Sequence, residues 1–136
     1  MIKANAVMTP RPAMVGGNDR LSDAVQVLQA LEVRHLPVVN EQRELIGMLS
    51  DRDLGALTLP VLVNDEWLGT VQTALGAPVS SIMTGDPISV DLDADLAEVV
   101  DLMLDNRIGA LPVIDAERRL VGIISYVDVL RKLCLE

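Results

Sequence analysis

The chain has 136 residues, of which 50% are hydrophobic, and it contains one Trp, one Tyr and no Phe. This length is typical of one compact domain, so a buried core would have to consist of aliphatic side chains and Met. The net charge of −9 disfavours nucleic acid as a partner, because that binding depends on clustered Lys and Arg.

The first half of the chain predicts a strand, a helix, two more strands and the start of a second helix. A short apolar strand is expected over 13–15, followed by the polar helix-start residues Asn18 and Asp19. A single apolar stripe then predicts a helix, with Leu21, Ala24, Val25, Leu28 and Leu31 on one face. Strands are expected over 36–39 and 45–49, and the second helix begins near Ser50.

An insert follows over residues 56–81, and it contains Pro60, Trp67, Gly69, Gly76 and Pro78. We expect it to extend the preceding helix briefly, to loop, and to return over 78–81. Trp67 is interpreted as a loop anchor over the apolar core, with a subunit contact as the alternative.

The second half repeats the first at a constant offset of 75 residues (83 − 8 = 75), which carries 7–55 onto 82–130 without a gap. Strands are therefore expected over 88–90, 111–114 and 120–124, with a helix striped by Leu96, Val99, Val100, Met103 and Leu104, and another from Ser125. A unit of roughly 50 residues is marginal alone, so both are expected to share a core. We predict one module over 1–136, with a first unit at 7–55, the insert at 56–81 and a second unit at 82–136.

Three motifs carry the duplication. Met8-Thr9 returns as Met83-Thr84, and Leu36-Pro37-Val38 returns as Leu111-Pro112-Val113. The third motif runs from Gly47 to Asp53 and returns from Gly122 to Asp128. In this order and spacing the motifs resemble the cystathionine-β-synthase (CBS) domain, and the tandem copies resemble a CBS pair, or Bateman module, of the stand-alone bacterial or archaeal type.

The resemblance implies an α+β fold in which two pseudo-symmetric β-α-β-β-α units pack sheet to sheet, and it implies pairing of two modules into a homodimer. It also implies binding of an adenosine ligand (AMP, ADP, ATP or S-adenosylmethionine) in clefts between the units. No catalytic step, obligatory cofactor or metal is implied. We expect no attached effector domain, so any regulatory output would pass to a separate, unknown effector protein.

The segments Ser50–Asp53 and Ser125–Asp128 support two interpretations. A Ser followed three residues later by a carboxylate matches a helix capping box, which needs no ligand. In the family, the matching Asp holds the ribose and the matching Ser helps to hold a phosphate at the helix start. Both interpretations stay open for Asp53 and Asp128.

Basic residues distinguish the two copies. Arg34, His35 and Arg52 stand in the first copy, where the second has Gly109, Ala110 and Val127. In the family, basic groups at such positions reach phosphates, and Arg is a strong phosphate ligand. The alternative is a solvated surface or pairing with nearby acidic residues.

Family geometry implies two unequal clefts. The stronger nucleotide site would combine Arg34, His35, Ser50, Arg52, Asp53, Thr84, Ile108, Gly109 and Ala110. The second cleft would combine Thr9, Val33, Ser125 and Asp128, with Arg34 and His35 on its adenine side and poor support for phosphate. Tyr126 could stack on a base or pack at the module interface.

We therefore expect a regulatory adenine-nucleotide-binding module, with a constitutive dimeric scaffold whose clefts are vestigial as the alternative. An enzyme is disfavoured, because one His and one Cys form no paired catalytic or metal set. The longest apolar stretch, over 56–63, falls short of the ~20 residues of a membrane span, and the first residues show no signal peptide. We expect a cytoplasmic protein without a membrane or nucleic-acid partner.

Overall fold

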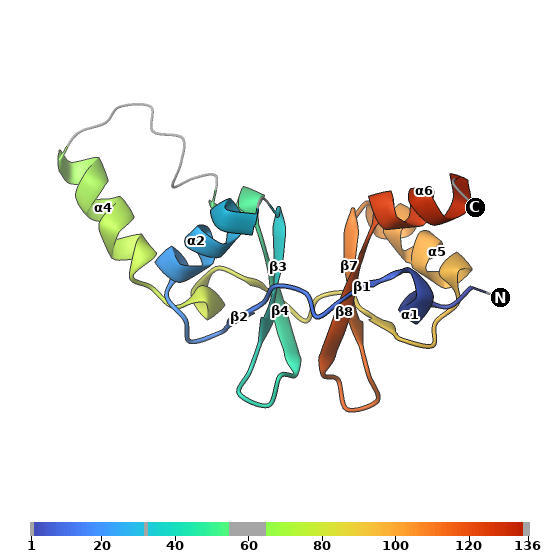
Figure 1. Cartoon of the computed structure of the whole chain (residues 1–136). Coiled ribbons are helices and arrows are strands. Elements are labelled where there is room, and N and C mark those ends of the chain that lie inside the picture. The colour runs from blue at the N-terminus through green and yellow to red at the C-terminus, as the bar shows by residue number, and fades with distance from the viewer. Residues whose placement is uncertain (1, 32, 55–64, 135–136) are drawn as a thin grey trace. The chain divides into compact units, whose positions relative to one another are not determined.

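The computed structural model describes residues 2–31, 33–54 and 65–134 of the chain. It divides into two compact units, each built around its own sheet (Figure 1). Unit 1 comprises Met1–Pro12, Gln42–Leu45 and Ile88–Glu136, and unit 2 comprises Ala13–Glu41 and Ile46–Pro87.

Unit 2 carries a sheet with the strand order β2-β3-β4-β5. Its elements in chain order are β2 (Val15–Gly16), α2 (Leu21–Leu31), β3 (His35–Val39), β4 (Leu45–Ser50), the 3-10 turn η1 (Asp51–Leu54), α4 (Asp65–Leu75), the 3-10 turn η2 (Val79–Ser81) and β5 (Thr84–Gly85). Strand β2 runs parallel to β3, and β4 runs antiparallel to β5.

Unit 1 carries a sheet with the corresponding order β1-β8-β7-β6. Its elements are α1 (Ala4–Val7), β1 (Thr9–Pro10), β6 (Val90–Asp91), α5 (Leu96–Asn106), β7 (Ala110–Ile114), β8 (Leu120–Ser125) and α6 (Tyr126–Cys134). Strands β6 and β7 are parallel, and β8 pairs antiparallel with both β7 and β1. The predicted mixed fold of strands and helices with an internal repeat is confirmed.

Each repeat contributes its Met-Thr segment to the sheet that holds the other repeat's long hairpin. Strand β1 precedes the first repeat's helix but pairs with β8, and β5 precedes the second repeat's helix but pairs with β4. Close packing explains the motif, because a Cβ on Gly47 would overlap the sulfur of Met83, and one on Gly122 would overlap the sulfur of Met8. Glycine at these two positions lets the Met side chain lie directly on the strand.

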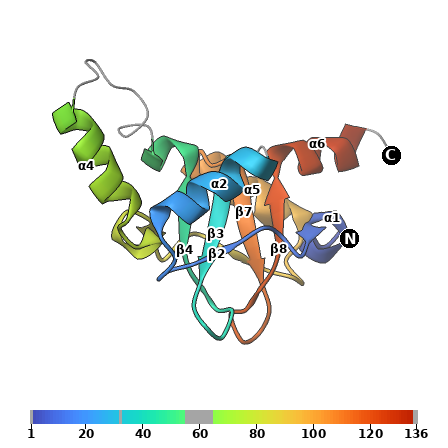
Figure 2. The same ribbon diagram turned by 60° about the vertical axis from the view of Figure 1, so that its left-hand side comes forward.

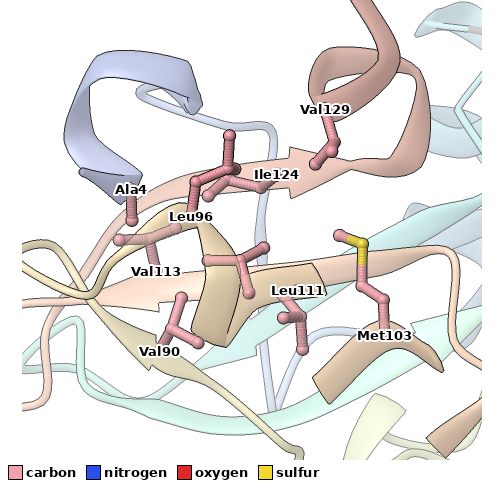
Figure 3. Packing of buried hydrophobic residues seen from close by; sticks show 9 residues of the cluster. Ala4, Val90, Leu96, Met103, Leu111, Val113, Ile124 and Val129 are labelled. Atoms are coloured by element: carbon pink, nitrogen blue, oxygen red, sulfur yellow. The ribbon is translucent and has the colours of Figure 1, made fainter. Parts of the chain in front are cut away.

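The cores of the two units are copies of one another. In unit 2, α2 packs along the sheet (Figure 2). It buries Leu21, Ala24 and Leu28 in the core cluster of this unit. The buried clusters match at the offset of 75 residues in the pairs Val79/Ala4, Val15/Val90, Leu21/Leu96, Ala24/Val99, Leu28/Met103, Leu36/Leu111, Val38/Val113 and Leu49/Ile124. Figure 3 shows the cluster of unit 1, which contains no aromatic side chain. The core is therefore aliphatic, as the composition predicts.

Within the described residues, the structure differs from the sequence-based expectation in two places. Residues 65–75 of the insert form helix α4 rather than a loop, and the backbone of Trp67 belongs to this helix. Residues 55–64, where the helix was expected to continue from Ser50, lie outside the described part of the chain. The turn α1 and its counterpart η2 were not predicted, because segments this short show no helical periodicity.

Candidate functional site

Both Ser-x-x-Asp segments form capping boxes. The backbone N–H of Ser50 donates to Oδ2 of Asp53 at 2.8 Å, and the N–H of Asp53 donates to Oγ of Ser50 at 3.3 Å. The same reciprocal bonds join Ser125 and Asp128 at 2.9 and 3.2 Å. Each box satisfies two N–H groups where η1 and α6 begin, so both Asp side chains have a structural role without any ligand.

The capping bonds leave part of each carboxylate available. Among the described residues, Oδ1 of Asp53 and Oδ1 of Asp128 take part in no hydrogen bond, and both residues are half-buried. A carboxylate has about four lone-pair sites, of which the capping bond uses one. The cap and a ribose contact are therefore compatible, and ribose binding stays a prediction.

A backbone hydrogen bond holds the segment before the Leu-Pro-Val strand beside the helix start. The N–H of Asp51 donates to the carbonyl of Arg34 at 2.9 Å, and the N–H of Tyr126 donates to the carbonyl of Gly109 at 2.9 Å. Arg34 and Arg52 therefore stand on neighbouring backbone segments of unit 2, although they are 18 positions apart in the sequence (52 − 34 = 18). In unit 1, the corresponding residues Gly109 and Val127 carry no charge.

Unit 2 thus contains a group of residues that we call the cationic cluster: Arg34, His35, Ser50, Arg52, Asp53 and Thr84. Arg34 and Arg52 are exposed, and neither has an ion-pair partner within the described residues. His35 is half-buried at the start of β3. Thr84 is exposed on β5, where it lies opposite Met48, two residues before Ser50 on β4.

Unit 1 contains the corresponding uncharged cluster, which we define as Thr9, Ile108, Gly109, Ala110, Ser125, Tyr126 and Asp128. Thr9 is exposed on β1 opposite Ile123, two residues before Ser125. Ile108, Gly109 and Ala110 are half-buried and precede or begin β7. The cluster is named for its lack of Lys, Arg and His, and Asp128 is its one acidic residue.

Each predicted cleft draws residues from both units, so the complete clefts stay predictions. Ile108, Gly109 and Ala110 belong to unit 1, whereas the basic residues predicted to share their site belong to unit 2. Likewise, Val33 belongs to unit 2, whereas Thr9, Ser125 and Asp128 belong to unit 1.

The ring of Tyr126 lies against the backbone of Gly109, a contact that the sequence does not reveal. A Cβ built on Gly109 would lie only 3.3 Å from Cδ1 of Tyr126. Tyr126 is nevertheless 57% exposed, so much of its ring faces solvent. The role of Gly109 in a nucleotide site stays a prediction.

Two absences hold for the described part of the chain. Within residues 2–31, 33–54 and 65–134 no helix is both long and apolar enough to cross a membrane. No group of three or more His, Cys, Asp or Glu side chains in those ranges could hold a metal ion.

Comparisons with known proteins connect this arrangement to one family. The model of the CBS domain matches residues 4–54 and 79–134, which starts each repeat three residues before the predicted boundary. A 33.4 kDa protein in the ribosomal RNA operon of Thermofilum pendens is 37% identical over 120 residues, and inosine-5'-monophosphate dehydrogenase of Methanocaldococcus jannaschii is 29% identical over 130 residues. These matches cover 85% and 96% of this chain.

The chain spans 40% of the Thermofilum protein and 23% of the dehydrogenase. Among solved structures, CBSX2 of Arabidopsis thaliana in complex with AMP matches with a TM-score of 0.83 and 29% sequence identity. That match covers 99% of this chain and 98% of the CBSX2 chain in that crystal structure. With two family segments, two copied cores and two capping boxes at one offset, this chain belongs to the CBS domain family as a tandem pair.

Proposed function

We propose that this chain is a cytoplasmic regulatory module that binds an adenine nucleotide and acts on a separate partner, without catalysing a reaction. The observation that carries the proposal is the cationic cluster in unit 2, where Arg34 and Arg52 lie near a capped carboxylate without a counter-ion among the described residues. In a chain of net charge −9, two exposed Arg side chains on neighbouring backbone segments, without an acidic partner among the described residues, favour an external anion.

The division of roles follows from the chemistry of the cluster. Asp53 would accept the ribose hydroxyls through Oδ1, while Arg34, Arg52, His35 and the Ser50 hydroxyl would hold the phosphates. The AMP complex of CBSX2, which is 29% identical over nearly the whole chain, supports a ligand of this class. Thr84, on β5 of the same unit, would contact the adenine.

Isothermal titration with AMP, ADP and ATP tests the proposal on the whole chain. Losing a charged hydrogen bond costs about 1.5–3 kcal/mol, so Arg52→Ala should weaken AMP binding by roughly 10- to 100-fold. Arg119→Ala is the matched control, since it removes an exposed charge of the same sign from a hairpin of unit 1. An equal loss in both variants, or two equal AMP sites per chain, would contradict a specific phosphate site in unit 2.

Regulation requires that the nucleotide bind two conformations with different affinity. The readout is a change in the partner's activity, or in the scattering profile of the module, on addition of the nucleotide. If saturating nucleotide changes neither the partner's activity nor the scattering profile, the chain is not a sensor.

A constitutive dimeric scaffold is the second candidate, and exposed apolar side chains on α5 and α6 favour it. Leu104 is 71% exposed, Leu130 is 52% exposed and Leu133 is 58% exposed. Leu130 and Leu133 lie three residues apart on α6 and therefore share a face, and an exposed apolar patch marks an interaction surface. We propose that a second copy of the chain covers them. Analytical ultracentrifugation tests this dimer: Leu130→Glu should sediment as a monomer, whereas the control Leu68→Glu on α4 should stay dimeric. A monomeric wild-type chain would refute the dimer.

Thermal denaturation distinguishes the two candidates. A ligand that binds only the folded chain stabilises it by about 2.7 kcal/mol at 100-fold excess over Kd, so the Tm must rise. A dimer whose Tm is unchanged by every adenine nucleotide and by S-adenosylmethionine would favour the scaffold.

A further inference from the structure

We infer that Tyr126 determines the ligand class of the second repeat, whose uncharged cluster takes a nucleoside without phosphate groups. The inference rests on the proposed function, because it assumes that both repeats receive adenosine ligands. It adds a specificity for the second repeat and names the residue responsible.

The uncharged cluster offers less support for a phosphate than the cationic cluster does. Where the cationic cluster has Arg34, His35 and Arg52, the second repeat has Gly109, Ala110 and Val127. Asp128 is half-buried beside them, and its negative charge would repel a phosphate placed near the start of α6. A neutral nucleoside, or one with a positive charge, meets no such repulsion and can still use Oδ1 of Asp128 for its ribose.

The position of the Tyr126 ring supplies a stacking surface. The ring approaches Gly109, where a Cβ would lie 3.3 Å from Cδ1 and 3.7 Å from Cε1, so any larger residue at 109 would push the ring away. The N–H of Tyr126 donates to the carbonyl of Gly109, which fixes the residue that carries the ring. With 57% of the residue exposed, the ring can meet a purine or a cationic group.

The first repeat has no equivalent surface, since Asp51 stands where the second repeat has Tyr126. Asp51 is exposed, and its backbone N–H makes the same bond to residue 34 that Tyr126 makes to residue 109. The two repeats therefore share the backbone geometry and differ in what their side chains offer: cations in one repeat and an aromatic ring in the other.

The experiment follows the binding of adenosine and AMP to the whole chain by NMR, with the amide signals of Ser125 and Asp128 reporting on unit 1 and those of Ser50 and Asp53 reporting on unit 2. Base–aromatic stacking is worth about 1–3 kcal/mol, so Tyr126→Ala should weaken the adenosine response of the unit 1 amides by at least about 5-fold. Tyr126→Phe keeps the ring and should retain binding. Val127→Arg, which copies Arg52, should let AMP perturb unit 1.

The outcomes separate this inference from the proposed function. If AMP perturbs unit 2 but Tyr126→Ala binds adenosine as tightly as the wild type, the role of Tyr126 is refuted while the nucleotide module stands. If AMP perturbs unit 1 of the wild type as strongly as unit 2, the phosphate-free specificity is refuted. If neither ligand perturbs either set of amides, the proposed function itself fails.

Discussion

Replacing Gly47 with Ala tests the contact that joins the Met-Thr motif to the opposite hairpin. Gly47 on β4 lies directly across from Gly85 on β5, and neither residue has a positive φ. A Cβ on Gly47 would lie 2.9 Å from Cγ of Met83 and 3.0 Å from the carbonyl oxygen of Thr84. A Cβ on Gly85 would meet no atom within 4 Å. The two glycines thus form a matched pair that differs in packing.

The difference in contacts gives the expected magnitude. A Gly→Ala change at a compatible position stabilises by about 0.4–1 kcal/mol through the unfolded chain, and this gain applies to both sites. Overpacking in a tight site costs about 1–3 kcal/mol. We therefore expect the free energy of unfolding of Gly47→Ala to be about 2 kcal/mol lower than that of Gly85→Ala. For a chain of this size, that gap corresponds to a Tm difference of roughly 6–10 °C.

Urea unfolding and calorimetry of the two variants measure this gap. In a double-mutant cycle with Met83→Ala, the cost of Gly47→Ala should fall, because the sulfur that the new Cβ would overlap is gone. The contact with the Thr84 carbonyl remains, since it belongs to the β4–β5 ladder, so the rescue should be incomplete. Equal stabilities of Gly47→Ala and Gly85→Ala would refute the packing explanation of the Met-Thr motif.

Three further substitutions test local features of unit 1. Arg118 has a φ of 63°, which costs an L-residue about 1 kcal/mol, so Arg118→Gly should raise the urea midpoint, and a lower midpoint would contradict this reasoning. Ser125→Ala removes the hydrogen bond from the N–H of Asp128 and should destabilise by about 1 kcal/mol in the same assay; an unchanged value would mean that the cap is dispensable. The hydrogen bond and charge of Asp95 raise the pKa of Lys3 above 10.5, so the ion pair stabilises the folded chain below that pH and is lost as the pH rises through the raised pKa. In an NMR titration, Asp95→Asn should lower the titration midpoint of Lys3. An unmoved midpoint would refute the pairing.

The repeated periodicity was sufficient to predict the main elements. The apolar stripe from Leu21 to Leu31 matches α2 at both ends, and the strands expected over 36–39 and 45–49 match β3 and β4 to within one residue. These segments are long enough to show a period, and their burial in one core enforces it. The short elements α1, η2, β1 and β5 have four residues or fewer and show no such pattern.

The contrast between the two candidate sites was also visible in the sequence. When the repeats are aligned, Arg34 and Arg52 occupy the positions of Gly109 and Val127. The reciprocal capping bonds of Ser50 and Ser125 follow from spacing alone, since a carboxylate three residues after a Ser reaches back to its N–H. Residue types and separations along the chain were sufficient for both inferences.

Other features depend on contacts between residues far apart in sequence. The pairing of Thr84 with β4, the packing of Met83 on Gly47 and the closeness of the Tyr126 ring to Gly109 are tertiary contacts. The sequence by itself therefore determined the duplication, the aliphatic core and the charge asymmetry of the repeats, since these follow from local pattern. The tertiary structure decided which sheet each Met-Thr segment joins and which side chain lies on each glycine, because those choices depend on packing between distant segments.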